Sequence, residues 1–344
     1  MNTSSAAHLR NAVIWSYRLL LGREPENDEV IEQHLRQNPA ATIDAIRQYF
    51  MASQEYLNKS SNPTDPISRL LANVPLTMRD QTLYAREAGF FRDMFGVKTR
   101  LSYLPAMYQQ YSGGIAGDFG MQHLPMHDAC ELRGVMEALH AAQGSFAVME
   151  LGAGWGPWIA MCASVARRMD LPFRLIAVEG SAEHVGYIHT HLHDNDVDPA
   201  QHRILHGVAA ANDGQAGFLK LAGFEYGATI MEQGSDDVDQ VASYSISSLL
   251  RDEPVLDIIH CDVQGHEVDV LSAGIGALGE RVRRIIIGTH GRDLEQCLFD
   301  LFGGNHWQLV EEMPCIMTVQ AGRTVLVQDG AQYWVNPRLG PVSS

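Results

Sequence analysis

The sequence predicts an α/β fold, a doubly wound and mainly parallel sheet, with an N-terminal all-helical domain and a C-terminal antiparallel hairpin. Three observations support this prediction. Strand-like runs and helical segments alternate from residue 144 onward. The strand-like runs are apolar nearly throughout, as in strands covered on both faces. The first run, FAVMEL, leads into three alternating glycines, Gly152, Gly154 and Gly156, where a strand would turn into a helix.

Residues 1–60 are predicted to form a helical accessory domain of three short helices. Apolar residues of the first segment recur at helical spacing: Val13, Ile14, Tyr17, Leu20 and Leu21. The runs IEQHLRQ and ATIDAIRQYFMASQEYL supply the other two helices. The polar stretch from Asn58 to Pro66 has the composition of a linker and sets the domain boundary.

Residues 61–140 are predicted to form a helical linker or lid region. The pattern from Ile67 to about Gln110 is helical, and a further helix ends near Leu139. The stretch from Tyr111 to Asp128 between them is rich in glycine and has no strong period. Such a segment fits either a lid over a binding site or a plain connector.

Residues 141–344 are predicted to form the sheet domain. The strands are expected at 146–151, 173–179, 203–210, 255–262 and 283–290. The helices are expected at 158–169, 182–194, 267–274 and 294–302. Three further strand-like runs follow, HWQLVE, CIMTVQ and TVLVQD, and the tight AGR turn between the last two predicts that the sheet ends in an antiparallel hairpin.

The composition excludes several classes of protein. Lys+Arg 25 against Asp+Glu 41 gives a net charge of −16, so phosphate backbones would be repelled and nucleic acid is not expected as a substrate. The five cysteines are scattered without C-x-x-C spacing, which indicates neither a zinc site nor a disulfide framework. No apolar run is long enough to span a bilayer and the first residues lack a secretory signal, so the chain is expected in the cytoplasm.

The turn after FAVMEL is predicted to meet a nucleotide-like ligand, because glycines let backbone N–H groups face it. The dinucleotide fingerprint needs a third glycine where this chain has Pro157. Instead an acid, Glu150, precedes the glycines, and a second acid, Glu179, ends the next strand. Glu179 would accept both hydroxyls of a ribose, and Glu150 would favour a positively charged ligand. S-adenosylmethionine fits best; a generic glycine turn with flanking acids is the alternative.

The residues expected to contact this cofactor lie at strand ends and in the turns that follow them. They are Glu150, Gly152, Gly154, Trp155, Gly156, Glu179, Gly180, Ala209 and Asp262.

The segment HCDVQGHEVDVL, from His260 to Leu271, is predicted to place polar groups beside the cofactor's methyl. Asp262 would leave the fourth strand, Gly265 would permit a sharp turn, and Glu267 would lie in the first turn of the next helix. Alternatively, Glu267 only complements its helix end and Asp262 only caps the turn.

These segments resemble the FkbM-type S-adenosylmethionine-dependent methyltransferases, which have the class I, Rossmann-like methyltransferase fold. The matching pieces include ELGAGWGPW, AVEGSAEHVGYIHTHLHDND, AAANDGQAGF, SISSLL, DIIHCDVQGHEVDVL and RRIIIGTH, and together they span Phe146 to Trp307. D-V-Q-G-x-E is the most specific of them. One departure is His260, where the family usually has lysine.

The resemblance implies methyl transfer to hydroxyls of sugars, polyketides or related natural products. It implies that Glu150, Gly152, Gly154 and Glu179 bind the cofactor, and that Asp262 and Glu267 lie at the reaction centre. It also speaks against methylation of nucleic-acid amino groups, because DVQG stands where such enzymes carry Asn/Asp-Pro-Pro-aromatic.

The N-terminal pieces YRLLLGREPE and YFMASQEYL resemble a small helical module found beside bacterial glycan-building enzymes. This resemblance implies a glycan-enzyme partner at these helices. The partners expected for the whole chain are therefore a small-molecule or glycan acceptor and that enzyme; a homo-oligomer is left open.

A sugar hydroxyl is a weak nucleophile near neutral pH and needs a general base. His290, after the fifth strand, is the first candidate, followed by His266 and Asp262. His189 and His193 have metal-ligand spacing on one helix, but no third ligand is evident and a solvated face is favoured. Asp262 and His290 could hold a metal, but the spacing of these residues in the sequence does not require one, and no metal site is predicted.

Two rival functions come from other classes. A nicotinamide or nucleotide-sugar oxidoreductase would share the sheet but should have the third glycine. A non-catalytic adaptor of glycan biosynthesis would bind no cofactor and would tolerate loss of Asp262.

Overall fold

The computed structural model is organised around a seven-stranded sheet. It describes residues 9–10, 13–14, 16–17, 25, 27–37, 46, 49–50, 66–124, 128–219, 230–231, 238–320 and 322–340. The strand order is β13 (Gln308–Met313), β16 (Gly330–Val335), β12 (Arg284–Thr289), β11 (Ile258–Cys261), β4 (Phe146–Leu151), β5 (Phe173–Glu179) and β6 (Arg203–His206).

The direction in which strands are added reverses between β4 and β11. Strands β4, β5 and β6 follow one another outward to one side, whereas β11 and β12 extend to the other, and all five are parallel. In open α/β sheets, ligands bind at the carboxyl ends of the strands beside such a reversal. The topology therefore points to the ends of β4 and β11 as the place for a site.

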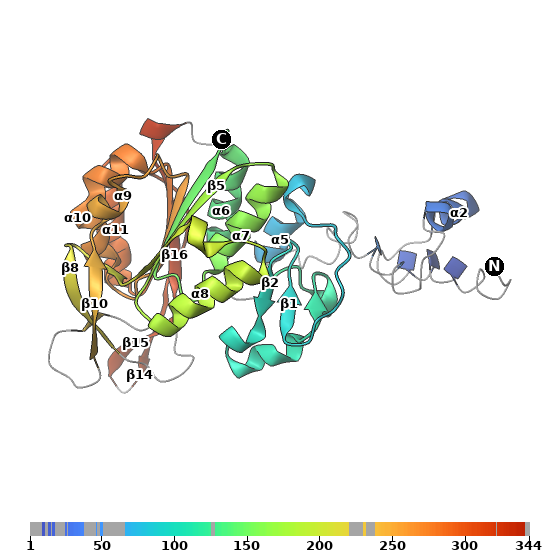
Figure 1. The fold of residues 1–344 in the computed structure, drawn as a ribbon, viewed down its shortest axis with the longest axis horizontal. Helices are drawn as coiled ribbons and strands as arrows, with labels where there is room; N and C mark the ends of the chain where they lie inside the picture. The colour runs from blue at the N-terminus through green and yellow to red at the C-terminus, as the bar shows by residue number, and fades with distance from the viewer. Residues whose placement is uncertain are drawn as a thin grey trace.

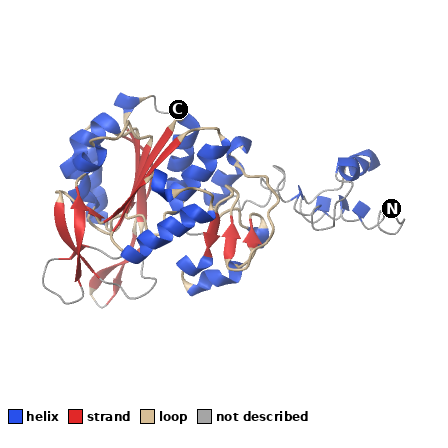
Figure 2. Cartoon of the chain, in the orientation of Figure 1, coloured by secondary structure: helices blue, strands red, loops and turns tan. Residues whose placement is uncertain are grey.

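Helices cover both faces of the sheet (Figure 1; Figure 2). One core joins the sheet to α6 (Ala129–Ala141), α7 (Pro157–Arg168) and α8 (Ala182–Asp194). The other joins it to α9 (Ile246–Leu250), α10 (Glu267–Arg281) and α11 (Arg292–Gly304). Every residue of β4 and β12 is buried, which explains why these strands are apolar without alternation.

Local sequence signals begin the helices that frame the site. Pro157 occupies the first turn of α7, where its missing N–H costs nothing. Ser181 caps α8 by accepting a hydrogen bond from the backbone N–H of His184 at 3.3 Å. Asp128 and Glu131 form a reciprocal capping box at the start of α6.

The third strand of the alternation is shorter than the sequence predicts. The run 203–210 divides at Gly207 into β6 and β7 (Val208–Ala209). β7 belongs to a second sheet, in which β10 (Val238–Tyr244), β8 (Gly214–Leu219) and β9 (Ile230–Met231) follow it in the order β7-β10-β8-β9. A side chain at residue 207 would lie 2.4 Å from the carbonyl oxygen of Ala242, so the change of sheet depends on glycine.

The helical pattern expected from Ile67 to Gln110 is wrong beyond its first turns. After α5 (Pro66–Ala72), the chain makes short 3-10 turns and a sheet ordered β2 (Lys98–Arg100), β1 (Phe90–Arg92) and β3 (Gly114–Ile115). Aromatic residues of this segment pack into the site domain, since Phe91 and Tyr103 form a buried cluster with Trp155. Tertiary packing overrides the local period here.

The C-terminal end of the sheet also differs from the expectation. β14 (Ile316–Gln320) and β15 (Arg323–Gln328) pair antiparallel, but as a two-stranded sheet apart from the main one. The antiparallel strands of the main sheet are β13 and β16, which pair with each other, while β16 also pairs with β12. β16 was not predicted as a strand.

At the N-terminus the structure describes α2 (Asp28–Gln37), which matches the second predicted helix. Buried residues of this region form a small core of their own: Val13, Tyr17, Ile31, Ile46 and Phe50. Most of the first and third predicted helices, and nearly all of the predicted linker, lie outside the described residues. Among the described residues, no helix is both long and apolar enough to cross a bilayer.

Candidate active site

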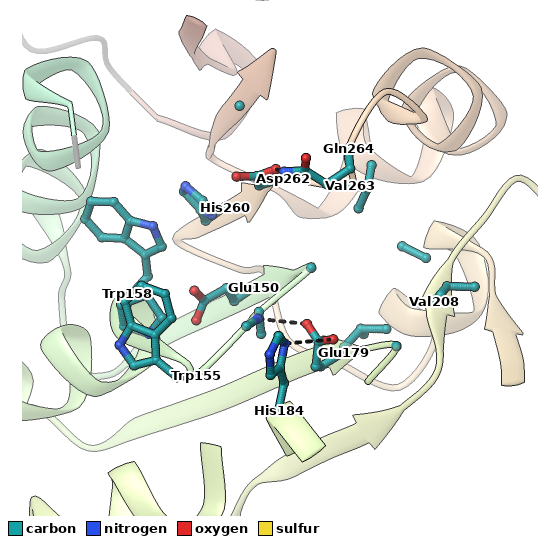
Figure 3. Close-up of a pocket in the computed structure, with 18 of the residues that line it drawn as sticks. Glu150, Trp155, Trp158, Glu179, His184, Val208, His260, Asp262, Val263 and Gln264 are labelled. Atoms are coloured by element: carbon teal, nitrogen blue, oxygen red, sulfur yellow. Dashed lines mark hydrogen bonds and ion pairs between the residues drawn. The ribbon is translucent and has the colours of Figure 1, made fainter. Parts of the chain in front are cut away.

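A cavity of about 390 Å³ lies at the carboxyl ends of β4, β5 and β11, beside the reversal of strand order. Its walls come from the glycine turn after β4, the ends of the neighbouring strands, the start of α6 and the residues before β16. In Figure 3, Glu150 lies between His260 and Asp262 on one side and Glu179 and His184 on the other. The cavity therefore joins the two constellations that the sequence singled out.

The glycine turn has the backbone shape that its sequence predicts. Gly152, Gly154 and Gly156 have φ angles of +74°, +53° and +72°, which side chains other than glycine rarely adopt. Gly152 is also tightly enclosed, because a Cβ there would lie 1.8 Å from the carbonyl oxygen of Asp262. The turn after β4 is thus packed directly against the end of β11.

The N–H groups of this turn are directed differently from the prediction. Those of Gly152 and Ala153 donate to the carbonyl oxygen of Val178 at 2.9 and 3.1 Å. Gly154 N–H donates to Glu179 Oε2 at 2.8 Å, and Gly156 N–H donates to the carbonyl oxygen of Ala153 at 2.7 Å. With these donors satisfied inside the protein, the turn is not built to hold a phosphate.

Gly152, Gly154 and Trp155 line the cavity, whereas Gly156 does not. A Cβ at residue 156 would contact Ile159 and Ile188 of the core at 3.2 and 3.4 Å. Gly156 therefore allows α7 to begin and to pack against the core.

Glu150 is 2% exposed and lines the cavity from the end of β4. Its Oε2 accepts a hydrogen bond from the N–H of Ile159 at 3.2 Å, so the carboxylate also supports the beginning of α7. Burial raises the pKa of Glu150 to about 8, although the charge of His260 and the helix amides act in the opposite direction. A cation in the cavity would favour the ionised carboxylate.

Glu179 ends β5 and is held by two backbone donors. Besides the bond from Gly154, its Oε1 accepts the N–H of Ser181 at 2.7 Å. His184 Nδ1 lies 3.7 Å from the same oxygen. Each carboxylate oxygen has a second lone pair, so a fixed Glu179 can still accept hydroxyl groups from a ligand in the cavity.

Next to Glu179 the cavity becomes apolar. Gly180, Ala209 and their neighbours Val178, Val208 and Phe218 line this part. A Cβ on Gly180 would lie 2.5 Å from the ring of Phe218, so the ring can occupy its position only because residue 180 has no side chain. A flat, apolar group such as a purine fits this end.

The second constellation forms one group of hydrogen-bonded and ion-paired side chains, only part of which reaches the cavity. Asp262 lines the cavity and its side chain is 34% exposed. Behind it, His290 Nε2 lies 3.3 Å from Asp262 Oδ1, and His290 Nδ1 lies 2.9 Å from Glu267 Oε1. Glu267 is fully buried. His290, the first candidate for the base, and Glu267 are therefore placed to hold Asp262.

Ionisation within this group follows from its geometry. Burial lowers the pKa of His290, but its hydrogen bond to Glu267 and the charge of Asp262 outweigh this and raise it to about 9. Burial raises the pKa of Glu267, but the bond from His290 outweighs it and lowers that pKa. The pKa of Asp262 is raised, chiefly because its carboxylate is partly withdrawn from water, although the charges of His290 and His260 act in the opposite direction. We interpret His290 as an imidazolium between two carboxylates.

His266, also predicted as catalytic, is turned away from this cavity. Gln264 and Gly265 have φ angles of +54° and +96°, and this sharp turn leads into α10. His266 instead borders a separate hollow with Ala210 and Asp269. His266 is not among the described residues that line the main cavity, so its predicted catalytic role gains no support from its position.

The donor atoms of Asp262, Glu267 and His290 lie within 4.8 Å of one another, as metal ligands could. However, His290 Nδ1 is bonded to Glu267, and Asp262 Oδ1 accepts a hydrogen bond from Gln264 Nε2 at 2.6 Å. We therefore interpret Asp262, Glu267 and His290 as a group of interacting ionisable side chains that share protons, and not as a metal site. His189 and His193 are both exposed on α8, as the solvated-face alternative expects.

Sequence reasoning missed the side of the cavity formed by α6 and β11. His260, Glu131 and Asp128 line it, and His260 Nε2 lies 2.8 Å from Glu131 Oε1. Asp329, just before β16, lines the same part. In the sequence His260 stands out only as a departure from a family pattern, and nothing in the spacing links it to Glu131, which lies 129 residues earlier.

The chain is similar to a protein of Jannaschia sp. (strain CCS1) described as "Putative methyltransferase". The two are 26% identical over 263 residues, which cover 73% of this chain and 94% of that protein. No protein-family model matches the chain.

Similar solved structures include a precorrin-6y C5,15-methyltransferase from Geobacter metallireducens GS-15, with a TM-score of 0.37 and 11% identity over 62% of this chain and 91% of that one. The METTL16 MTase domain gives a TM-score of 0.36 and 10% identity over 60% and 68% of the two chains. These structural likenesses are too remote to indicate a substrate.

Proposed function

We propose that this chain is an S-adenosylmethionine-dependent methyltransferase that methylates a hydroxyl of a sugar, a glycan or a related natural product. The observation that chiefly supports the proposal is the cavity at the reversal of strand order, where Glu150 and Glu179 frame a glycine turn with satisfied N–H groups.

This cavity suits a cation better than a pyrophosphate. A dinucleotide needs free backbone donors at the turn after the first strand, and in this chain those donors are used internally. S-adenosylmethionine instead brings a sulfonium, an ammonium group, a ribose and a purine. Glu150 would face the positive charge, Glu179 the ribose hydroxyls, and Val208 and Phe218 the purine.

The acceptor is inferred from charge and from the D-V-Q-G-x-E segment. The net charge of −16 argues against a nucleic acid, and the FkbM-type resemblance of that segment supports a hydroxyl. The name of the Jannaschia protein supports methyl transfer at the general level.

S-adenosylmethionine, when bound, supplies a methyl group activated for in-line displacement. The protein then has to align the acceptor oxygen with that methyl and to take up the hydroxyl proton. Asp262, held by His290 and Gln264, is positioned to orient the acceptor hydroxyl. Asp262 and His260 are the titratable side chains of the β11 end that line the cavity.

We further propose that the chain is organised as a helical accessory domain over 1–60, a linker or lid region over 61–140 and the catalytic domain over 141–344. In this organisation the accessory helices would recruit a glycan-building enzyme in the cytoplasm. A pull-down with residues 1–60 removed tests this part separately from catalysis.

Titration calorimetry tests the cofactor. We expect S-adenosylmethionine and S-adenosylhomocysteine to bind one site per chain, and NADH to give no heat under the same conditions. Tight binding of NADH would favour an oxidoreductase, and binding of none of the three would favour a non-catalytic adaptor. Mass spectrometry of surface glycans and small metabolites from cells with and without the protein should then reveal the product that lacks a methyl group.

A further inference from the structure

A second carboxylate–histidine pair, Glu131 and His260, lines the cavity on the same side as Asp262 (Figure 3). His260 and Glu150 are direct neighbours across β11 and β4, so their side chains leave the sheet on the same face. Glu131 reaches His260 from α6, and its Oε1 lies 2.8 Å from His260 Nε2. All three residues line the cavity.

Glu131 is itself fixed in place. Its Oε2 accepts a hydrogen bond from the backbone N–H of Asp128 at 2.9 Å, as part of the capping box of α6. The other oxygen is therefore directed at one nitrogen of His260, which orients the imidazole ring. The ring also lies against Trp158, with centroids 5.0 Å apart.

The second nitrogen of His260, Nδ1, has no hydrogen-bond partner among the described residues, although the side chain is only 5% exposed. A buried polar atom without a partner is costly, and at a cavity wall it indicates a group that a ligand satisfies. His290 is not available to a ligand in this way, because its ring is not part of the cavity lining.

We propose, building on the proposed function, that His260 takes the proton from the acceptor hydroxyl and that Glu131 orients it for this task. In the step, the hydroxyl oxygen forms a bond to the methyl carbon while the carbon–sulfur bond breaks and its electron pair stays on sulfur. The O–H proton passes to His260 Nδ1, and the resulting imidazolium is stabilised by Glu131. Water later removes the proton.

The charged groups around His260 set the pH range of this base. Burial lowers the pKa of His260, but the hydrogen bond that it donates to Glu131 and the charges of Glu131, Glu150 and Asp262 outweigh this effect and raise the pKa. A sulfonium in the cavity would oppose these carboxylates. Turnover should therefore increase with pH above about 6.5, the ordinary value for histidine.

The first test needs no acceptor. In the ¹⁵N-histidine-labelled full chain, NMR at alkaline pH should show the His260 tautomer protonated at Nε2 and bare at Nδ1, with the signal assigned by its loss in His260→Gln. Glu131→Gln keeps the capping box but should weaken this preference. The opposite tautomer in the wild-type protein would overturn the proposal.

The second test measures transfer from methyl-labelled S-adenosylmethionine to an extract of glycans and metabolites from cells that lack the protein. His260→Gln should reduce incorporation by about 10²–10⁴-fold, the contribution of a general base. Its affinity for S-adenosylhomocysteine should stay within about twofold, which also verifies folding. Glu131→Gln should reduce incorporation less and shift the pH profile.

His140→Gln and Glu280→Gln are matched controls, since both side chains are exposed and outside the cavity. They should behave as wild type. If the wild-type protein transfers methyl and His260→Gln does so at a similar rate, the role of His260 is refuted while the proposed function stands. If the wild-type protein binds no S-adenosylhomocysteine, it is the proposed function that fails.

Discussion

Substitution of Gly152 by alanine tests whether the glycine turn and the end of β11 form one tightly packed unit. The new Cβ would lie 1.8 Å from the carbonyl oxygen of Asp262 and 2.9 Å from its carbonyl carbon. The two chain segments would have to separate by about 1.5 Å to restore ordinary contact. Such a movement would widen the cavity at its centre and displace Asp262.

The expected loss of folding stability in Gly152→Ala has two causes. A φ of +74° costs an alanine about 1–2 kcal/mol, and overpacking costs about 1–3 kcal/mol. The free energy of unfolding should therefore fall by about 2–5 kcal/mol and the Tm by roughly 5–15 °C. Differential scanning calorimetry measures the Tm, and titration with S-adenosylhomocysteine should show affinity lost as well.

Gly186→Ala is the matched control. Gly186 is exposed within α8, and a Cβ there would meet nothing within 4 Å. Its replacement should stabilise the protein by about 0.5–1 kcal/mol, because alanine loses less entropy in a helix. If Gly152→Ala instead melts with the wild-type protein and binds S-adenosylhomocysteine normally, the close contact between the turn and β11 is refuted.

Further predictions concern the carboxylates and His290. Glu179→Gln should weaken S-adenosylhomocysteine binding by about 10²–10³-fold, because hydrogen bonds to a charged group contribute about 1.5–3 kcal/mol each; unchanged affinity in calorimetry would contradict the ribose assignment. Affinity for S-adenosylmethionine should increase with pH up to about 8, the raised pKa of Glu150, since a cation favours the ionised form; Glu150→Gln should remove this slope, and a flat wild-type profile would refute the reasoning. The raised pKa of His290, about 9, stabilises the fold below pH ~6.5, and this contribution should be lost as the pH rises through about 9, as urea unfolding of wild type and His290→Gln can measure. His290→Ala should abolish turnover and leave cofactor affinity intact; turnover at the wild-type rate would contradict this. The same substitution should lower the free energy of unfolding by about 3–5 kcal/mol, because Glu267 is left buried without its partner.

The parallel part of the sheet could be predicted from the sequence because its strands are buried on both faces. FAVMEL and the three consecutive isoleucines of RRIIIGTH are apolar without alternation, and the structure places β4 and β12 there. β16 could not be predicted in the same way, because it begins Gly-Ala-Gln and lacks a strand-like start; its complete burial comes from its place between β12 and β13. That position arises only when the whole sheet is assembled, so the local sequence of β16 cannot predict it.

The candidate site was predictable only where its residues are close in sequence. The acid–glycine turn and Glu179 could be located from strand ends, but the bond from Gly154 to Glu179 could not. That bond reverses the inference that the turn offers its N–H groups to a ligand. The pairing of Glu131 with His260 likewise depends on how α6 packs on the sheet, which no local pattern encodes.

The central claim is that Glu150 and Glu179 bind an adenosine-bearing sulfonium over the glycine turn. A crystal structure of the protein soaked with S-adenosylmethionine tests it most directly. The account predicts ribose hydroxyls within hydrogen-bond distance of Glu179 and the sulfonium on the Glu150 side of Gly152. A cavity that stays empty, or one that takes up a pyrophosphate at the turn, would contradict it.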